Sequence, residues 1–199
     1  MPKAPIVQAG NIVLRSSATP VDPAKITANE MRSLVRTMVE TMRAAPGVGL
    51  AAPQIGVGLS VIVLEDTEQR MSRLTAEQRA ERGRTPFPLL VIFNPVLRIL
   101  NADKVTFFEG CLSVQGYMAL VDRHLAVEVT GFDAEGKPFQ REMTGWGARI
   151  LQHEVDHLQG TLYIDRMHSR SFCCNDAMAA KWLDMPIRDV KESLGIKSP

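Results

Sequence analysis

The sequence predicts a single α+β domain, in which mainly antiparallel β-sheets surround a central helix that carries an HExxH motif, with a further helix near the N-terminus. Two segments whose apolar residues recur with a helical period, about 29–45 and 146–159, enclose a region of short β-rich runs. Because the strands cluster between the helices and do not alternate with them, parallel βαβ units are not expected. The chain has 199 residues, 45% of them apolar, which is enough to bury one core.

The N-terminal helix is predicted over residues 29–45. Thr27 and Glu30 fit a capping box at its start, and Pro46-Gly47 ends it. A strand over residues 60–65 follows. The apolar stripe of the helix consists of Met31, Leu34, Val35, Met38, Val39 and Met42.

Residues 66–88 are polar and charged, and we interpret them as an insertion. Thr75 together with Gln78 predicts a short helix inside it, which Gly83 ends. The composition of the insertion does not indicate its role.

From residue 89 to 144 the pattern is one of short strands, and residues 133–136 (Asp-Ala-Glu-Gly) mark a turn. The second helix, 146–159, is closed by Gly160. We therefore assign residues 1–170 to one domain and 171–199 to a C-terminal tail whose structure the sequence does not indicate. The predicted strands are 89–93, 96–100, 105–108, 117–121 and 124–131.

Composition and charge exclude several classes of protein. The 23 Lys and Arg residues against 22 Asp and Glu leave a formal net charge of +1, so no direct binding of nucleic acid is predicted. No apolar run approaches the roughly 20 residues that span a bilayer, and no membrane association is expected. The N-terminus lacks a signal-peptide core and has little of a transit peptide, so in an organelle this sequence would be the mature form. The three cysteines, two of them adjacent, indicate a reducing compartment.

The HExxH motif, residues 153–157, is the strongest chemical feature of the sequence. His153 and His157 are separated by about one helical turn, so both imidazoles can reach one metal ion. Glu154 lies on the next face, close enough to exchange a proton with water without being a ligand. The alternative is an exposed helix with two chance histidines.

A hydrolytic metal site needs a third protein ligand. The metzincin pattern fails because Tyr163 stands where a histidine is needed, and Glu192, the only glutamate after Glu154, lies near the C-terminus. Cys111, within EGCLS (109–113), is the better candidate, although a lone cysteine is usually a small buried apolar residue. A third segment, GVGLAAPQIG (47–56), is by itself best explained as an ordinary helix-to-strand turn, although its small residues would also let a ligand approach the backbone closely.

Together GVGLAAPQIG, EGCLS and QHEVDHLQG, in this order and spacing, resemble the three signature motifs of the peptide deformylases. The resemblance covers about residues 10–163. The 66–88 insertion and the GWGAR run at 145–149 resemble the eukaryotic organellar, mitochondrial-type branch. The resemblance implies a metal-dependent hydrolase that removes the N-formyl group from the formyl-methionine of nascent polypeptides and releases formate.

The resemblance also implies a role for each matching residue. Cys111, His153 and His157 correspond to the metal ligands, with water as the fourth. Fe(II) is the expected native metal, and zinc, nickel or cobalt are expected in purified protein. Further correspondences are Glu154 as general acid/base, Gln54 and the backbone N–H of Leu112 as oxyanion donors, and Glu109 paired with Arg123.

Trp146 and Ile150 share a helical stripe with the two histidines, at i, i+4, i+7 and i+11. We interpret them as the wall of a pocket for the methionine side chain, although both suit a plain core as well. Val48, Gly49 and Gly110 are further expected substrate-binding residues.

The expected partners are formyl-Met nascent peptides close to the ribosome. The predicted location is the mitochondrion, with a plastid or the bacterial cytoplasm as alternatives. Trp182 is expected to anchor the tail, a homodimer contact being the other interpretation. Two rival functions are an HExxH zinc endopeptidase and a non-catalytic protein that binds a metal or formyl peptides.

Overall fold

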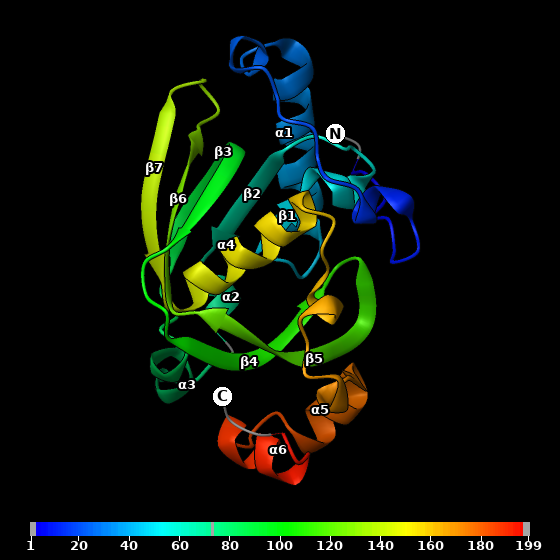
Figure 1. The fold of residues 1–199 in the computed structure, drawn as a ribbon, viewed down its shortest axis with the longest axis vertical. Coiled ribbons are helices and arrows are strands. Elements are labelled where there is room, and N and C mark those ends of the chain that lie inside the picture. Colours follow the sequence, from blue (N-terminus) through cyan, green and yellow to red (C-terminus); the bar gives the residue numbers. More distant parts are fainter. Residues whose placement is uncertain (1–2, 73, 197–199) are drawn as a thin grey trace.

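The computed structural model describes residues 3–72 and 74–196. Helix α4 (Gly145–Leu158) lies at its centre, between a five-stranded and a three-stranded sheet (Figure 1). The predicted α+β class is therefore confirmed, with antiparallel sheets around the HExxH helix. In the part of the chain that the structure describes, no helix is long and apolar enough to cross a membrane.

The larger sheet has the order β1-β2-β3-β6-β7, and every neighbouring pair is antiparallel. Its central strands are apolar on both faces because both faces are covered. On β2, Val61 and Val63 face one cluster while Ile62 and Leu64 face another, as the two-residue period of a strand requires. The strands are β1 (Gly49–Ala51), β2 (Val61–Asp66), β3 (Phe87–Ile99), β6 (Ala126–Phe132) and β7 (Pro138–Thr144).

Helix α1 (Asn29–Ala44) covers one face of this sheet, and α4 covers the other (Figure 1). Met38 and Met42 of α1 are fully buried in the cluster with Val61 and Val63. Ile150, Leu151 and Val155 of α4 belong to the opposite cluster. The apolar stripe predicted for the first helix is therefore the face that packs on the sheet.

The smaller sheet has the order β4-β5-β8 and brings the EGCLS segment to α4. Strands β4 (Lys104–Cys111) and β5 (Val114–His124) form a hairpin whose register shifts between Gly110 and Cys111. Strand β8 (Cys173–Cys174) adds the beginning of the tail at the other edge of β5.

The tail is folded onto the smaller sheet as far as the structure describes it. Trp182 is 7% exposed and packs with Phe108, Leu120 and Val190, so its predicted role as the anchor of the tail is confirmed. The remaining helices are α2 (Glu68–Met71), α3 (Ala76–Glu81), α5 (Asn175–Lys181) and α6 (Ile187–Ser193). The 3₁₀ helices are Ile12–Arg15, Pro23–Lys25, Ala52–Ile55, Tyr163–Asp165 and Ser169–Ser171.

Three local predictions need correction. The predicted strands 89–93 and 96–100 belong to one strand, β3, which contains Asn94 in the left-handed region with a φ of 50°. The Asn94 side chain there bonds both the N–H and the carbonyl of Val21, at 2.8 and 2.7 Å. The capping box at the start of α1 is also wrong, because Ala28 is the N-cap and no side chain caps the helix. Strands β1, β7 and β8 were not predicted.

Candidate active site

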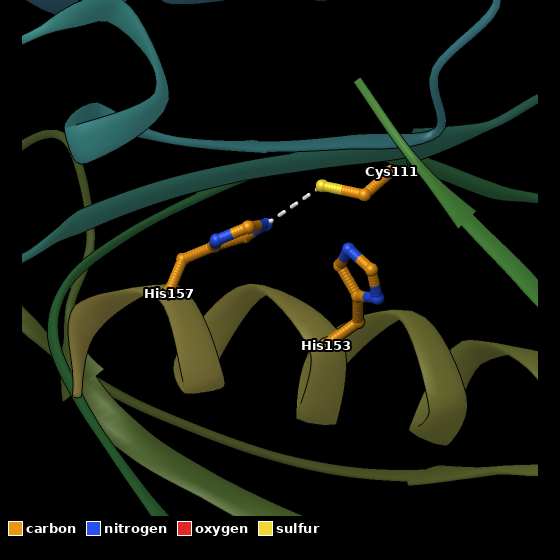
Figure 2. Close-up of side chains that lie close together, drawn as sticks. All are labelled: Cys111, His153 and His157. Atoms are coloured by element: carbon orange, nitrogen blue, oxygen red, sulfur yellow. Dashed lines mark hydrogen bonds between the residues drawn. The ribbon is translucent and has the colours of Figure 1, made fainter. Parts of the chain in front are cut away.

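Three potential metal ligands meet between α4 and the end of β4. The ligand atoms of Cys111, His153 and His157 all lie within 4.8 Å of one another. Cys111 Sγ lies 3.3 Å from His157 Nε2, and both rings rise from one side of α4 toward the thiol (Figure 2). The four-residue spacing of the histidines stacks them one turn apart, and the hairpin of β4 and β5 delivers the cysteine.

A buried carboxylate orients the first histidine. Glu109 Oε2 accepts a hydrogen bond of 3.0 Å from His153 Nδ1, which leaves Nε2 for the metal side. Arg123 forms two bonds of 2.9 Å to Glu109, and Arg149 adds a third of 2.7 Å. Burial alone would raise the pKa of Glu109, but Arg123 and His153 hold it well below its ordinary value. Glu109 is therefore an anion beside the candidate metal ligands.

A second carboxylate, Asp156, completes this ionic network on α4. It accepts one hydrogen bond of 2.5 Å from Arg123 and two, of 2.6 and 2.7 Å, from Arg166. The family resemblance implied the pairing of Glu109 with Arg123, but the sequence analysis did not predict the contacts of Arg149, Asp156 and Arg166. Only the position of Arg149 and Asp156 on the HExxH helix could have pointed to them.

Glu154 stands apart from that network. It is 4% exposed, and its Oε2 atom is buried without a hydrogen-bond partner. Burial raises the pKa of Glu154 to about 7, so the carboxyl group can exchange a proton near neutral pH. A Cβ on Gly49 would lie 2.3 Å from Glu154 Oε1, so a glycine at that position lets the backbone of β1 lie against the carboxylate.

Gln54 reaches the cluster from the 3₁₀ helix Ala52–Ile55. Its Oε1 accepts a hydrogen bond of 2.9 Å from the N–H of Ala51. This bond leaves the NH₂ end of the amide to face the site. Its Nε2 lies 3.5 Å from Cys111 Sγ and 3.4 Å from Ser113 Oγ. Gln54 is therefore placed as a donor beside the candidate metal centre.

A cavity of about 790 Å³ opens over these groups. All the expected substrate-binding residues line it: Val48, Gly49, Gly110, Trp146 and Ile150, as do Gln54, Leu112 and Glu154. The sequence did not indicate that the N-terminal segment contributes Ile6 and Gln8 to the same wall. Gln8 Nε2 bonds the carbonyl of Leu112 at 3.0 Å, which ties this segment to the EGCLS turn.

The donor set suits a divalent transition metal. A thiolate and two imidazoles are ligands that zinc and iron(II) accept, and three protein ligands leave a position open. Burial lowers the pKa of His157 well below its ordinary value, which keeps the imidazole neutral and its lone pair available. For His153, Cys111 and Glu109 outweigh burial and raise the pKa, so the surroundings favour positive charge there. A bound cation would meet that demand.

Comparison with known proteins agrees with the site. The family model described as Polypeptide deformylase matches residues 3–172. The chain is 47% identical to Peptide deformylase 1A, chloroplastic/mitochondrial, of Arabidopsis thaliana, over 96% of this chain and 69% of the relative. It is 46% identical to the human Peptide deformylase, mitochondrial, over 86% of this chain and 70% of the relative. With Peptide deformylase 1 of Streptomyces coelicolor the identity is 45%, over 98% and 87%.

The solved structures give the same result. The class I type b peptide deformylase from Acinetobacter baumannii, bound to Met-Ala-Ser, superposes with a TM-score of 0.74 at 30% identity. The match covers 83% of this chain and 98% of that one. The chain therefore belongs to the peptide deformylase family, the metal-dependent enzymes that remove the N-formyl group from nascent polypeptides.

Proposed function

We propose that this enzyme hydrolyses the formamide of N-formyl-methionyl peptides with Glu154 as the general acid/base and with a metal held by Cys111, His153 and His157. The observation that carries the proposal is one unpaired, buried carboxylate beside three convergent metal ligands, with Glu154, Cys111 and His153 lining one cavity. A divalent ion bound there supplies a Lewis acid and makes water more acidic.

In the proposed reaction Glu154 takes a proton from the attacking water as oxygen bonds to the formyl carbon. The same carboxyl group then gives that proton to the amine nitrogen as the C–N bond breaks. The products are formate and a peptide with a free methionyl amine. A pKa of about 7 for Glu154 suits a group that both accepts and donates a proton at neutral pH.

Gln54 and the backbone N–H of Leu112 are the proposed donors to the oxygen that becomes negative as water adds. Gln54 Nε2 already faces the ligand cluster, held by the bond from Ala51 to its Oε1. Donors fixed before the reaction stabilise developing charge without reorganisation.

Different residues of the cavity wall are assigned to two parts of the proposed substrate. We assign Trp146 and Ile150 to the methionine side chain, and Val48, Gly49 and Gly110 to the formyl-peptide backbone. The Acinetobacter enzyme binds Met-Ala-Ser, the peptide that deformylation of formyl-Met-Ala-Ser would leave. We therefore propose a short formyl-Met peptide as the minimal substrate.

We further propose Fe(II) as the native metal. A Cys-His-His site accepts iron as well as zinc. Because raw affinity favours zinc, the supply of metal in the compartment determines which ion is bound.

The curated relatives include mitochondrial, chloroplastic and bacterial enzymes. Of these locations we propose the mitochondrion, with nascent chains near the ribosome as partners and residues 1–170 as the catalytic domain.

The test is the release of formate from formyl-Met-Ala-Ser by protein loaded with metal under nitrogen, with acetyl-Met-Ala-Ser and casein as comparison substrates. We expect rapid formate release and no cleavage of casein. Casein cleavage without formate release would favour the rival endopeptidase, and stoichiometric binding of the formyl peptide without turnover would favour a binding protein.

A further inference from the structure

Trp146 lies between two cavities. Phe108, Met118 and Trp146 line both the active-site cavity and a second cavity of about 510 Å³. The second cavity lies between α3 of the 66–88 insertion and residues 182–187 of the tail. Close packing on all sides normally holds a core side chain in one rotamer. With space on two sides, the indole of Trp146 needs another restraint.

Three guanidinium groups surround that indole. The Cζ atoms of Arg82, Arg84 and Arg149 lie 5.7, 5.3 and 5.7 Å from its ring centroid. Phe107 adds an edge contact with ring centroids 5.8 Å apart. Cations at this range over an indole are attracted to its π face. Two of the three arginines belong to the insertion.

Arg84 is itself held rigidly. Its Nε and Nη2 bond the two carboxylate oxygens of Asp66 at 2.7 and 3.0 Å. Asp66 ends the buried strand β2, and its side chain is 1% exposed. A two-point bond of this kind fixes the plane of the guanidinium as well as its position. The position of the Arg84 guanidinium over the Trp146 ring is therefore fixed relative to the main sheet.

The backbone of the insertion meets the start of α4 at the same place. The N–H of Trp146 donates to the carbonyl of Gly83 at 3.4 Å. Gly145 has a φ of +56°, and a Cβ on it would lie 2.4 Å from the Gly83 oxygen. A larger residue at 145 would push the insertion away from the helix, so the contact depends on this glycine.

From these contacts we propose that the 66–88 insertion is a specificity element, in which Arg84, anchored on Asp66, holds the Trp146 indole as the wall of the methionine pocket. This inference rests on the proposed function, since it concerns which formyl peptides are accepted. Arg84 is a positioning residue: it acts through Trp146. If the indole is released, it can turn toward the second cavity, and the methionine pocket widens.

The test compares Arg84→Lys with the parent. Lysine keeps a cation for the buried Asp66, so the strand end stays neutralised, but it loses the planar group that lies over the indole. Arg98→Lys is the matched control, because Arg98 pairs with Glu128 at 2.9 Å without any described contact to Trp146. Arg82→Gln is a second variant that leaves the Asp66 pair intact.

The readout is kcat/KM for formyl-Met-Ala-Ser relative to formyl-Phe-Ala-Ser. We expect the ratio to fall about 3- to 10-fold in Arg84→Lys, through a higher KM for the methionine peptide with kcat kept. Arg82→Gln should shift the ratio in the same direction, and Arg98→Lys should leave it unchanged. A ratio in Arg84→Lys equal to that of Arg98→Lys overturns the proposal.

A second readout does not depend on turnover. Trp146 and Trp182 are the two tryptophans of the chain, so a Trp182→Phe background isolates Trp146 fluorescence. Acrylamide should quench it more strongly after Arg84→Lys, and equal quenching overturns the proposed restraint. If the parent releases no formate from any formyl peptide, the proposed function has failed, whereas the quenching comparison still judges the restraint.

Discussion

The carboxylate of Glu109 accepts a 3.0 Å hydrogen bond from His153 Nδ1 while two arginines from different elements neutralise it. Arg123 comes from β5 and Arg149 from α4. Strand β4, strand β5 and the HExxH helix are thus tied together at one buried anion. Where a histidine binds a metal, removing such a hydrogen-bond partner commonly lowers metal affinity about 10- to 100-fold.

Glu109→Gln should therefore weaken metal binding without removing a ligand. We expect the affinity for the metal to be about 10- to 100-fold lower than that of the parent. Stability should also fall by about 3–5 kcal/mol, because the buried Arg149 loses its carboxylate partner and Arg123 keeps only Asp156. Chelator competition and urea unfolding measure the two effects. Glu68→Gln is the control, because the Glu68 side chain is 67% exposed in its pair with Arg79, and it should change neither metal affinity nor stability by much.

Glu154→Gln should keep the metal and lose turnover. The amide has nearly the shape of the carboxyl group but cannot accept the proton, so kcat should drop by about 10²–10⁴. Metal analysis beside the formate assay separates the two roles, and Glu192→Gln on the tail is the matched control. Loss of metal together with activity would mean that Glu154 is a ligand.

How far the site can be predicted depends on the range of the interactions. The spacing within HExxH is a local property, so the shared face of His153 and His157 follows from helical geometry alone. The contact of Arg149 with Glu109 joins residues 40 positions apart and depends on how α4 packs on β4. The sequence separation of these two residues therefore does not predict that they are in contact.

The missed strand β7 has a similar explanation. Its central residues Gln140, Arg141 and Glu142 are polar, since only Met143 of the strand is buried. Backbone hydrogen bonds to β6 define β7, and such bonds do not require apolar side chains. The sequence of β7 therefore contains no apolar run that would predict a strand. By contrast, both faces of β2 are covered, so its residues Val61–Leu64 form an apolar run that predicts a strand from the sequence alone.

Ile150 should contribute to methionine selectivity. It is 5% exposed and lines the active-site cavity. Burying a methionine side chain there contributes roughly 1.5–3 kcal/mol, so formyl-Met peptides should be preferred over formyl-Gly peptides by about 10- to 150-fold. Ile150→Ala should lower that preference, whereas Val129→Ala in the same apolar cluster should lower stability alone. Equal rates of the parent on both peptides would remove the pocket assignment.

Acid should weaken the fold partly through Asp122. Burial alone would raise its pKa, but bonds from Thr106 and His168 outweigh it and lower the pKa. A depressed pKa means that the stabilisation is present above the unfolded value of about 3.9 and is lost as pH falls through the folded value. Asp122→Asn should therefore destabilise the protein at pH 7 and much less near pH 3. Urea unfolding at both values tests this, with the exposed Asp184→Asn as control.

Cys111→Ser should weaken metal retention, because a hard, weakly acidic hydroxyl replaces a soft thiolate. Cys173→Ser is the matched control, since Cys173 lies on β8 outside the ligand cluster. With Fe(II), air should also inactivate the parent, through oxidation of the iron or of the Cys111 sulfur, while nickel and cobalt forms should survive. Metal content and formate release before and after exposure to air measure both effects. If Cys111→Ser and Cys173→Ser both retain metal like the parent, Cys111 is not a ligand and the proposed metal centre is wrong.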